Sequence, residues 1–295
     1  MVLIKKIVRK LLFFFAPLVF VLGKILKSSA LLKISHSMDD YNVRAVITDA
    51  RLKGRNADTL HQLTHAINLI GASNEKADGI IKSCLSQSQS QLLQDIVCVL
   101  VNHSKNDGYF VEVGVGDGVN ISNTYLLEKQ FGWNGLLVEP SKAFHKNITA
   151  QRQAILDKRA AASSSGEILE FEEDTERGEF SKLVSSGKGE KTNKKALYYE
   201  VETATLTEIL KQHNAPSHID YMSIDTEGTE VDILAGLDLD HYTIGLFTIE
   251  HNYRPETLAA LRELLEPKGY HQIYPTLSRY DIWYVHDSID LTYVD

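Results

Sequence analysis

The chain has 295 residues, of which 43% are hydrophobic and 24% are charged, so it is long enough for one large globular domain and an appendage. Its net charge of −8 argues against nucleic acid as a partner, because nucleic-acid-binding domains are basic. The two cysteines, Cys84 and Cys98, lack the spacing of a metal site and are typical of buried thiols in a reducing compartment.

The N-terminal segment, residues 1–38, differs from the rest of the chain in charge. It carries seven of the 31 lysine and arginine residues and none of the 39 acidic residues. Its apolar run from Leu11 to Leu22 has basic residues on both sides and is shorter than the ~20 residues that cross a bilayer. We therefore expect this segment to lie on the cytoplasmic face of a membrane. A spanning helix over Ile7 to Leu26, a signal peptide and a core helix are the alternatives.

Residues 39–107 have a helical pattern. Apolar side chains recur at three- and four-residue steps over 60–70, and residues 91–101 are amphipathic. No catalytic motif stands out in this region. It is predicted to form a helical cap or linker ahead of the main domain, which spans 108–295.

From Tyr109 onward the chain alternates strand-like and helix-like segments, which predicts an α/β fold with a mostly parallel sheet and helices on both faces. Strands are predicted at 109–113, 134–138, 156–162, 168–172, 219–225 and 244–250, followed by an antiparallel pair near 270–275 and 281–286. Helices are predicted at 121–130, 141–151, 205–213, 229–235 and 255–266. The stretch 173–197, rich in Glu, Lys, Gly and Ser, is predicted to be a loop.

A glycine loop follows the first of these strands. Gly114, Gly116 and Gly118 stand at alternate positions, and glycine tolerates positive φ and has no side chain to keep a ligand from the backbone. Glu139 ends the next predicted strand, where an acidic side chain can accept hydrogen bonds from ribose hydroxyls. The two features together predict a nucleoside cofactor.

The charges in the loop indicate which cofactor this is. A dinucleotide fold requires G-x-G-x-x-G, but Val119 replaces the third glycine and Asp117 would repel a pyrophosphate. Glu112 and Asp117 favour a cation instead. The E-x-G-x-G-x-G form therefore fits S-adenosylmethionine, which has a sulfonium, an ammonium and two ribose hydroxyls. A nicotinamide-dependent oxidoreductase is the less favoured alternative.

Several blocks of the chain resemble the FkbM-type S-adenosylmethionine-dependent methyltransferase family. These blocks are FVEVGVGDGV (110–119), SNTYLLE (122–128), GWNG (132–135), VEP (138–140), IDYMSIDTEGTE (219–230) and TIEHN (248–252). The resemblance implies a class I methyltransferase fold, which is Rossmann-like, with a mostly parallel seven-stranded sheet behind the helical N-terminal extension. The residues expected to contact the cofactor are Glu112, Gly114, Gly116, Asp117, Gly118, Asn123, Glu139, Pro140 and Asp225.

Ionisable groups gather at two of the predicted strand ends. Asp225 and Glu227 follow one strand, and Glu250 and His251 follow the next, so the carboxyl ends of neighbouring strands bring them together. We favour Asp225, Glu250 or His251 as a general base or a contact for an acceptor hydroxyl. A divalent cation on Asp225 and Glu250 is an alternative that we do not favour, and no metal ligand is predicted. In a third interpretation, Asp225 binds the methionine amino end of the cofactor or caps the next helix, and Glu250 pairs with Arg254 or a lysine.

The sequence therefore predicts a cytoplasmic, membrane-associated O-methyltransferase that uses S-adenosylmethionine. Family resemblance implies a sugar hydroxyl on a glycan, a glycolipid or another hydroxyl-bearing acceptor. The basic apolar N-terminus favours a lipid-linked glycan. The alternative in a different class is a membrane-tethered protein that binds the cofactor without turnover. Intact acidic residues at positions 112, 139, 225 and 250 argue against it.

Overall fold

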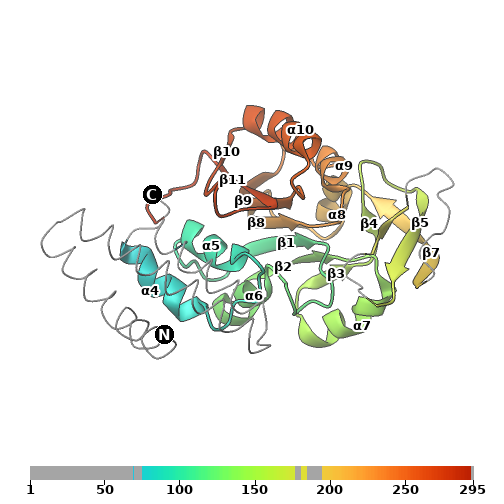
Figure 1. The fold of residues 1–295 in the computed structure, drawn as a ribbon, viewed down its shortest axis with the longest axis horizontal. Helices are drawn as coiled ribbons and strands as arrows, with labels where there is room; N and C mark the ends of the chain where they lie inside the picture. The colour runs from blue at the N-terminus through green and yellow to red at the C-terminus, as the bar shows by residue number, and fades with distance from the viewer. Residues whose placement is uncertain (1–68, 70–74, 177–180, 185–194, 294–295) are drawn as a thin grey trace, which may run out of the picture. The chain divides into compact units, whose positions relative to one another are not determined.

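Within the unit 68–295, the computed structural model describes residue 69 and residues 75–176, 181–184 and 195–293 (Figure 1). The predicted membrane segment 1–38 lies outside the described residues, as does most of the first half of the predicted helical region. Among the described residues, none of the helices combines the length and the apolar character needed to cross a bilayer.

Two helices precede the sheet, α4 (Glu75–Cys84) and α5 (Gln94–Val101), in agreement with the helical pattern of this region. Every residue of α5 is buried. Its one acidic side chain, Asp95, accepts hydrogen bonds from Ser88 Oγ at 2.7 Å and from the Gln89 N–H at 3.2 Å. The buried carboxylate is therefore satisfied within the chain.

The centre of the unit is a seven-stranded sheet with the order β10-β11-β9-β8-β1-β2-β3. Its strands are β1 (Tyr109–Val113), β2 (Asn134–Val138), β3 (Ile155–Asp157), β8 (His218–Ile224), β9 (Thr243–Glu250), β10 (Tyr270–Gln272) and β11 (Asp281–His286). Neighbouring strands pair in parallel, except that β11 runs antiparallel to both β9 and β10. The mostly parallel sheet and its closing antiparallel pair confirm the predicted architecture.

The central strands are mostly apolar because helices cover both faces of the sheet. In β1, for example, Phe110, Val111 and Val113 are buried. The covering elements are α6 (Tyr125–Phe131), α7 (Lys142–Gln151), α8 (Leu206–Gln212), α9 (Glu230–Ala235), α10 (Pro255–Leu265) and the 3₁₀ turn η2 (Glu266–Lys268). Figure 1 shows α6 and α7 on one face and α9 and α10 on the other.

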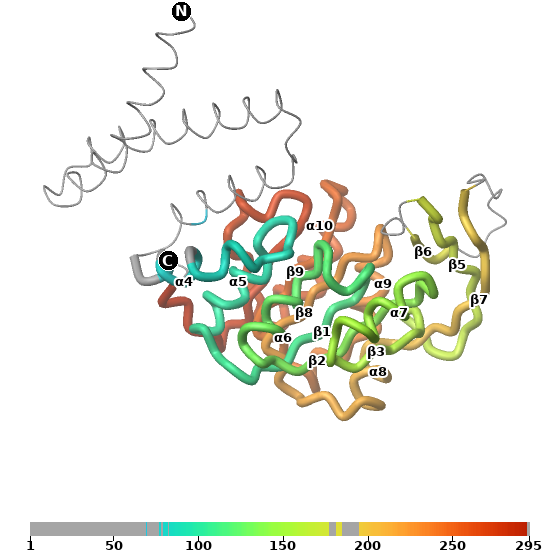
Figure 2. Tube along the Cα trace, turned by 90° about the horizontal axis from the view of Figure 1, so that it is seen from below, coloured from blue at the N-terminus to red at the C-terminus, as the bar shows by residue number. Residues whose placement is uncertain are grey.

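A second sheet has the strand order β4-β7-β5-β6 and lies beyond β3 (Figures 1 and 2). Its strands are β4 (Ala160–Ala161), β5 (Ile168–Asp174), β6 (Lys182–Leu183) and β7 (Ala196–Ala204). The prediction of a single strand over 156–162 is therefore wrong. It is two strands, because β3 pairs with β2 while β4 pairs with β7 in the other sheet.

The prediction of a loop over 173–197 is also wrong for the described residues of this stretch. Here β6 and the first residues of β7 pair with β5. A polar contact helps to hold this hairpin in place. Glu173 accepts hydrogen bonds from Tyr199 Oη at 2.6 Å and from Ser141 Oγ at 2.9 Å, just before α7 begins. The second sheet is thereby tied to the segment that follows β2.

The start of α6 differs most from its predicted position, since the helix begins at Tyr125 rather than at residue 121. Ile121 has a positive φ of 57°, which an α-helix cannot contain. Ser122 Oγ accepts hydrogen bonds from the N–H groups of Thr124 and Tyr125, at 3.3 and 3.2 Å, and orders the chain just before the helix, whose N-cap residue is Thr124. The glycine loop after β1 therefore runs as far as Thr124.

Candidate active site

The ends of β1, β2 and β8 meet at one edge of the central sheet. The Gly114 N–H donates to the Val138 carbonyl at 3.1 Å, and the Asp225 N–H donates to the Val113 carbonyl at 3.0 Å. Glu139 follows Val138 directly. The glycine loop, Glu139 and Asp225 therefore lie side by side just beyond the strand ends, where ligands bind in open α/β sheets.

The three loop glycines have positive φ and meet different surroundings. A Cβ on Gly114 would overlap the carbonyl oxygen of Asp225, so this glycine lets β1 and β8 approach each other. A Cβ on Gly118 would lie 3.1 Å from Ile148 of α7. A Cβ on Gly116 would meet no atom within 4 Å. Gly116 therefore leaves its backbone facing open space, in which a ligand can lie against it.

Glu139 ties the glycine loop to the end of β2. Its Oε2 accepts hydrogen bonds from the N–H groups of Val115 and Gly116, both at 2.9 Å, and its Oε1 accepts one from the Ser141 N–H at 2.8 Å. Burial raises the pKa of Glu139 to about 7, although the three donors act in the opposite direction. A carboxylate oxygen has two lone pairs, so Oε1 keeps one for a ligand hydroxyl.

Glu112 makes all of its described contacts inside the protein. It accepts hydrogen bonds from Ser122 Oγ at 2.9 Å, from Thr124 Oγ1 at 2.6 Å and from the Asn123 N–H at 2.6 Å. The buried guanidinium of Arg152 lies 3.7 Å away. The cation that Glu112 meets in this structure is thus an arginine, and the carboxylate shapes the far end of the glycine loop.

Asp117, Asn123 and Pro140 lie around the same loop. Asp117 Oδ1 accepts hydrogen bonds from the two N–H groups at positions 119 and 120, both at 2.8 Å, which folds the turn. Asn123 donates to Ser223 Oγ on β8 at 2.9 Å, and its buried Oδ1 finds no hydrogen-bond donor among the described residues. Pro140 is partly exposed after β2. Of the three, Asn123 holds a buried polar atom that a ligand could satisfy.

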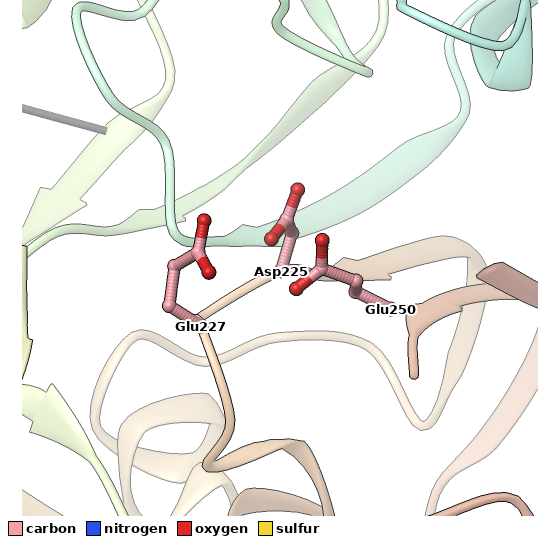
Figure 3. A group of neighbouring side chains, drawn as sticks. All are labelled: Asp225, Glu227 and Glu250. Carbon is pink, nitrogen blue, oxygen red and sulfur yellow. The ribbon is translucent and has the colours of Figure 1, made fainter. Parts of the chain in front are cut away.

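An acidic cluster, formed by Asp225, Glu227 and Glu250, lies at the ends of β8 and β9 (Figure 3). Each residue offers one carboxylate oxygen, and these oxygens lie within 4.8 Å of one another. Burial, followed by repulsion from neighbouring carboxylates, raises the pKa of both Asp225 and Glu250. The cluster therefore favours a proton, a hydrogen-bond donor or a cation beside these oxygens.

His251 has both ring nitrogens engaged by backbone groups. Its Nδ1 accepts a hydrogen bond from the Tyr253 N–H at 3.0 Å, so Nε2 carries the ring hydrogen and donates to the Asp281 carbonyl at 3.0 Å. Burial lowers the pKa of His251 and keeps the ring neutral. In this arrangement His251 has no free lone pair for the proton of an acceptor, and its contacts hold the turn after β9.

Sequence reasoning missed the residues opposite the acidic cluster. Asp281 on β11 pairs in register with Glu250 on β9. Its Oδ2 accepts hydrogen bonds from Gln94 Nε2 at 2.9 Å and Trp283 Nε1 at 3.2 Å, and burial raises its pKa to about 6. The antiparallel pairing predicted for 281–286 could have revealed Asp281. Nothing local could have revealed Gln94, which α5 brings from 187 residues earlier.

Several residues in the loops at this edge have a left-handed backbone. Glu227, Asn252, Tyr253 and Arg279 have positive φ values between 47° and 59°. They lie in the turns that follow β8 and β9 and in the turn that precedes β11. Non-glycine residues in this conformation are costly, and positive φ also occurs elsewhere among the described residues, as at His103 and Ser104, so these values mark tight turns at this edge.

Comparison with known proteins gives the family. The sequence profile described as "Methyltransferase FkbM domain" matches residues 112–271, which is more than half of the chain and includes every predicted site residue. The chain belongs to the FkbM methyltransferase family. No curated protein has a significant match to the chain.

Solved structures of methyltransferases resemble this FkbM protein at low identity. A precorrin-6y C5,15-methyltransferase from Geobacter metallireducens GS-15 is 11% identical, with a TM-score of 0.36 over 65% of this chain and 85% of the other. A proposed RNA methyltransferase from Pyrococcus horikoshii is 9% identical, with a TM-score of 0.34 over 76% of this chain and 96% of the other.

The family match makes the chain an S-adenosylmethionine-dependent methyltransferase, and its mostly parallel seven-stranded sheet agrees with the predicted class I methyltransferase fold. The described residues fit that cofactor. Gly116 leaves room against the loop, Glu139 Oε1 keeps a lone pair for a ribose hydroxyl, and the acidic cluster provides negative charge for a sulfonium.

Proposed function

We propose that this FkbM methyltransferase transfers a methyl group to a hydroxyl of a glycan or lipid-linked glycan. The position of Asp225 carries the proposal. Its N–H is bonded to the end of β1 next to Gly114, and its carboxylate belongs to the acidic cluster. Asp225 therefore lies next to both the glycine loop and the acidic cluster. The methyl group of a cofactor bound at the loop would face the carboxylates.

The glycine loop and Glu139 are the groups that would hold the cofactor. S-adenosylmethionine supplies a methyl group that its sulfonium has already activated. The residues of the chain must hold this cofactor, place the acceptor in line with the methyl group and receive a proton. Glu139 suits the ribose because it already orders the loop through Val115 and Gly116.

The acidic cluster suits a hydroxyl acceptor. During transfer the bond between sulfur and the methyl carbon breaks, a bond between the acceptor oxygen and that carbon forms, and the hydroxyl proton leaves. A carboxylate of Asp225 or Glu250 can accept the hydroxyl hydrogen bond and take this proton. The same negative charge would repel an acceptor phosphate or carboxylate. The basic, apolar residues 1–38 support an acceptor that lies at a membrane surface.

Methyl-labelled S-adenosylmethionine, incubated with the chain and a cell-envelope lipid extract, tests this function. We expect label in the glycolipid fraction that survives mild base, since base removes methyl esters but leaves ethers. Label confined to proteins, amines or base-labile esters would overturn the hydroxyl acceptor. No label in any fraction, despite tight binding of S-adenosylhomocysteine, would support the alternative of a cofactor-binding protein without turnover.

A further inference from the structure

The geometry of the acidic cluster matches the size of a divalent cation. Asp225, Glu227 and Glu250 each offer one oxygen, and these oxygens lie within 4.8 Å of one another. Two ligands of one ion cannot be farther apart than twice the metal–oxygen bond, which is about 4.2 Å for Mg²⁺ and about 5 Å for Ca²⁺. The three oxygens can therefore contact one ion after side-chain movements of about 1 Å or less.

The charged groups that act on Asp225 and Glu250 are acidic. Within the described ranges, neither Asp225 nor Glu250 forms a salt bridge. Two further acids, Glu230 and Asp281, lie close enough to repel both carboxylates. Glu230 is already occupied by the N–H groups of Thr226 and Gly228, and Asp281 by Gln94 and Trp283. Neither of these two acids therefore offsets the negative charge of Asp225 and Glu250.

Glu250 supplies independent evidence that something is bound here. The residue is only 8% exposed, and its buried Oε2 has no hydrogen-bond partner among the described residues. Burying a carboxylate oxygen without a partner is costly, so such an atom marks a place for a ligand. Figure 3 shows the Glu250 side chain pointing toward Asp225, with Glu227 on the other side of Asp225.

We propose that Asp225, Glu227 and Glu250 bind one divalent cation of the kind that takes oxygen ligands, such as Mg²⁺ or Mn²⁺. Water fills the remaining positions on the ion. The role of the ion rests on the proposed function: it orients the acceptor hydroxyl and polarises its oxygen, and a second oxygen of a coordinating carboxylate takes the proton. The sequence alone favoured a site without metal, but it could not show that these oxygens converge or that Glu250 is buried.

The test is a titration of the full chain, freed of metal by chelation, with Mn²⁺ followed by electron paramagnetic resonance, with and without S-adenosylhomocysteine. We expect one site per chain, and at least tenfold weaker binding in Glu227→Gln and Glu250→Gln. Asp232→Asn is the matched control, because it removes an exposed carboxylate from α9 and should leave the affinity unchanged. No saturable binding, or equal affinity in all variants, would overturn the site.

Thermal unfolding separates a cation site from a purely structural cluster. In chelator, Glu250→Gln should melt at a higher temperature than the wild type because it relieves repulsion among the carboxylates. Added Mg²⁺ should raise the melting temperature of the wild type and of Asp232→Asn but not that of Glu250→Gln. If Glu250→Gln does not fold, the partly buried Glu227→Gln gives the same comparison.

Activity distinguishes failure of this inference from failure of the proposed function. Cation binding without methyl transfer to any hydroxyl would leave the site intact and overturn the proposed acceptor. Full methyl transfer in chelator would leave the proposed function intact and overturn the role of the cation.

Discussion

The loop glycines allow a prediction that separates packing from cofactor binding. In Gly114→Ala the new Cβ would overlap the Asp225 carbonyl oxygen, so β1 and β8 must part and the hydrogen bond from the Asp225 N–H to the Val113 carbonyl is lost. Overpacking, unpaired buried backbone groups and a left-handed alanine together cost about 3–8 kcal/mol. This is a large share of the ~5–15 kcal/mol that stabilises a typical domain.

Gly116→Ala should behave in a different way. Its φ of 58° costs about 1–2 kcal/mol in an alanine, but its Cβ has open space. If the cofactor lies against this backbone, the methyl group should weaken binding of S-adenosylhomocysteine at least about tenfold, or about 1.4 kcal/mol. Gly166→Ala is the matched control, since Gly166 has a φ of 77°, has equally open surroundings and lies between β4 and β5.

Urea unfolding and calorimetric titration with S-adenosylhomocysteine measure both effects. Gly116→Ala and Gly166→Ala should lose similar stability, and only Gly116→Ala should lose affinity. Equal affinity in these two variants would refute the location of the cofactor. If Gly114→Ala proved as stable as Gly166→Ala, the account of packing between β1 and β8 would fail.

Three further predictions concern Glu139, Arg152 and the N-terminal segment. Burial raises the pKa of Glu139 from 4.5 to about 7, so the folded protein holds this proton more tightly than the unfolded chain does. The free energy of unfolding should therefore fall as pH rises between these two values, and Glu139→Gln should flatten that fall in urea titrations at several pH values. Arg152→Ala removes the buried guanidinium that lies 3.7 Å from Glu112 and 2.9 Å from Glu128, of which Glu128 keeps Lys129 at 2.7 Å, and should lower the free energy of unfolding by about 3–5 kcal/mol. A loss below about 1 kcal/mol in urea would contradict this role. Deleting residues 1–38 should release the chain from anionic vesicles in a sedimentation assay without changing its affinity for S-adenosylhomocysteine. If the full-length protein does not sediment with such vesicles, the segment is not a membrane-binding element.

The central sheet could be predicted well from the sequence because its strands are buried on both faces. A strand such as β9, with the sequence TIGLFTIE, therefore reads as a mainly apolar run with clear ends. The second sheet, β4-β7-β5-β6, could not be predicted in this way. In β7 the exposed Glu200 and Glu202 alternate with the buried Val201 and Thr203, a strand signal that the polar stretch before it obscured.

The candidate site could be predicted as a set of residues but not as a set of roles. The sequence placed acids at the right strand ends. It could not show that the guanidinium of Arg152 lies 3.7 Å from the Glu112 carboxylate. Nor could it show that backbone groups form hydrogen bonds with both ring nitrogens of His251. These roles depend on contacts between residues distant in sequence. Local chemistry indicates which groups are present, and only packing decides which of them remain available to a ligand.

A crystal structure of the chain with S-adenosylhomocysteine tests the central claim most directly. The account predicts that the ribose hydroxyls bond to Glu139, that the ligand lies against the backbone of Gly116, and that its sulfur faces Asp225 and Glu250. A ligand bound away from Glu139, or one whose sulfur points away from the acidic cluster, would contradict the account.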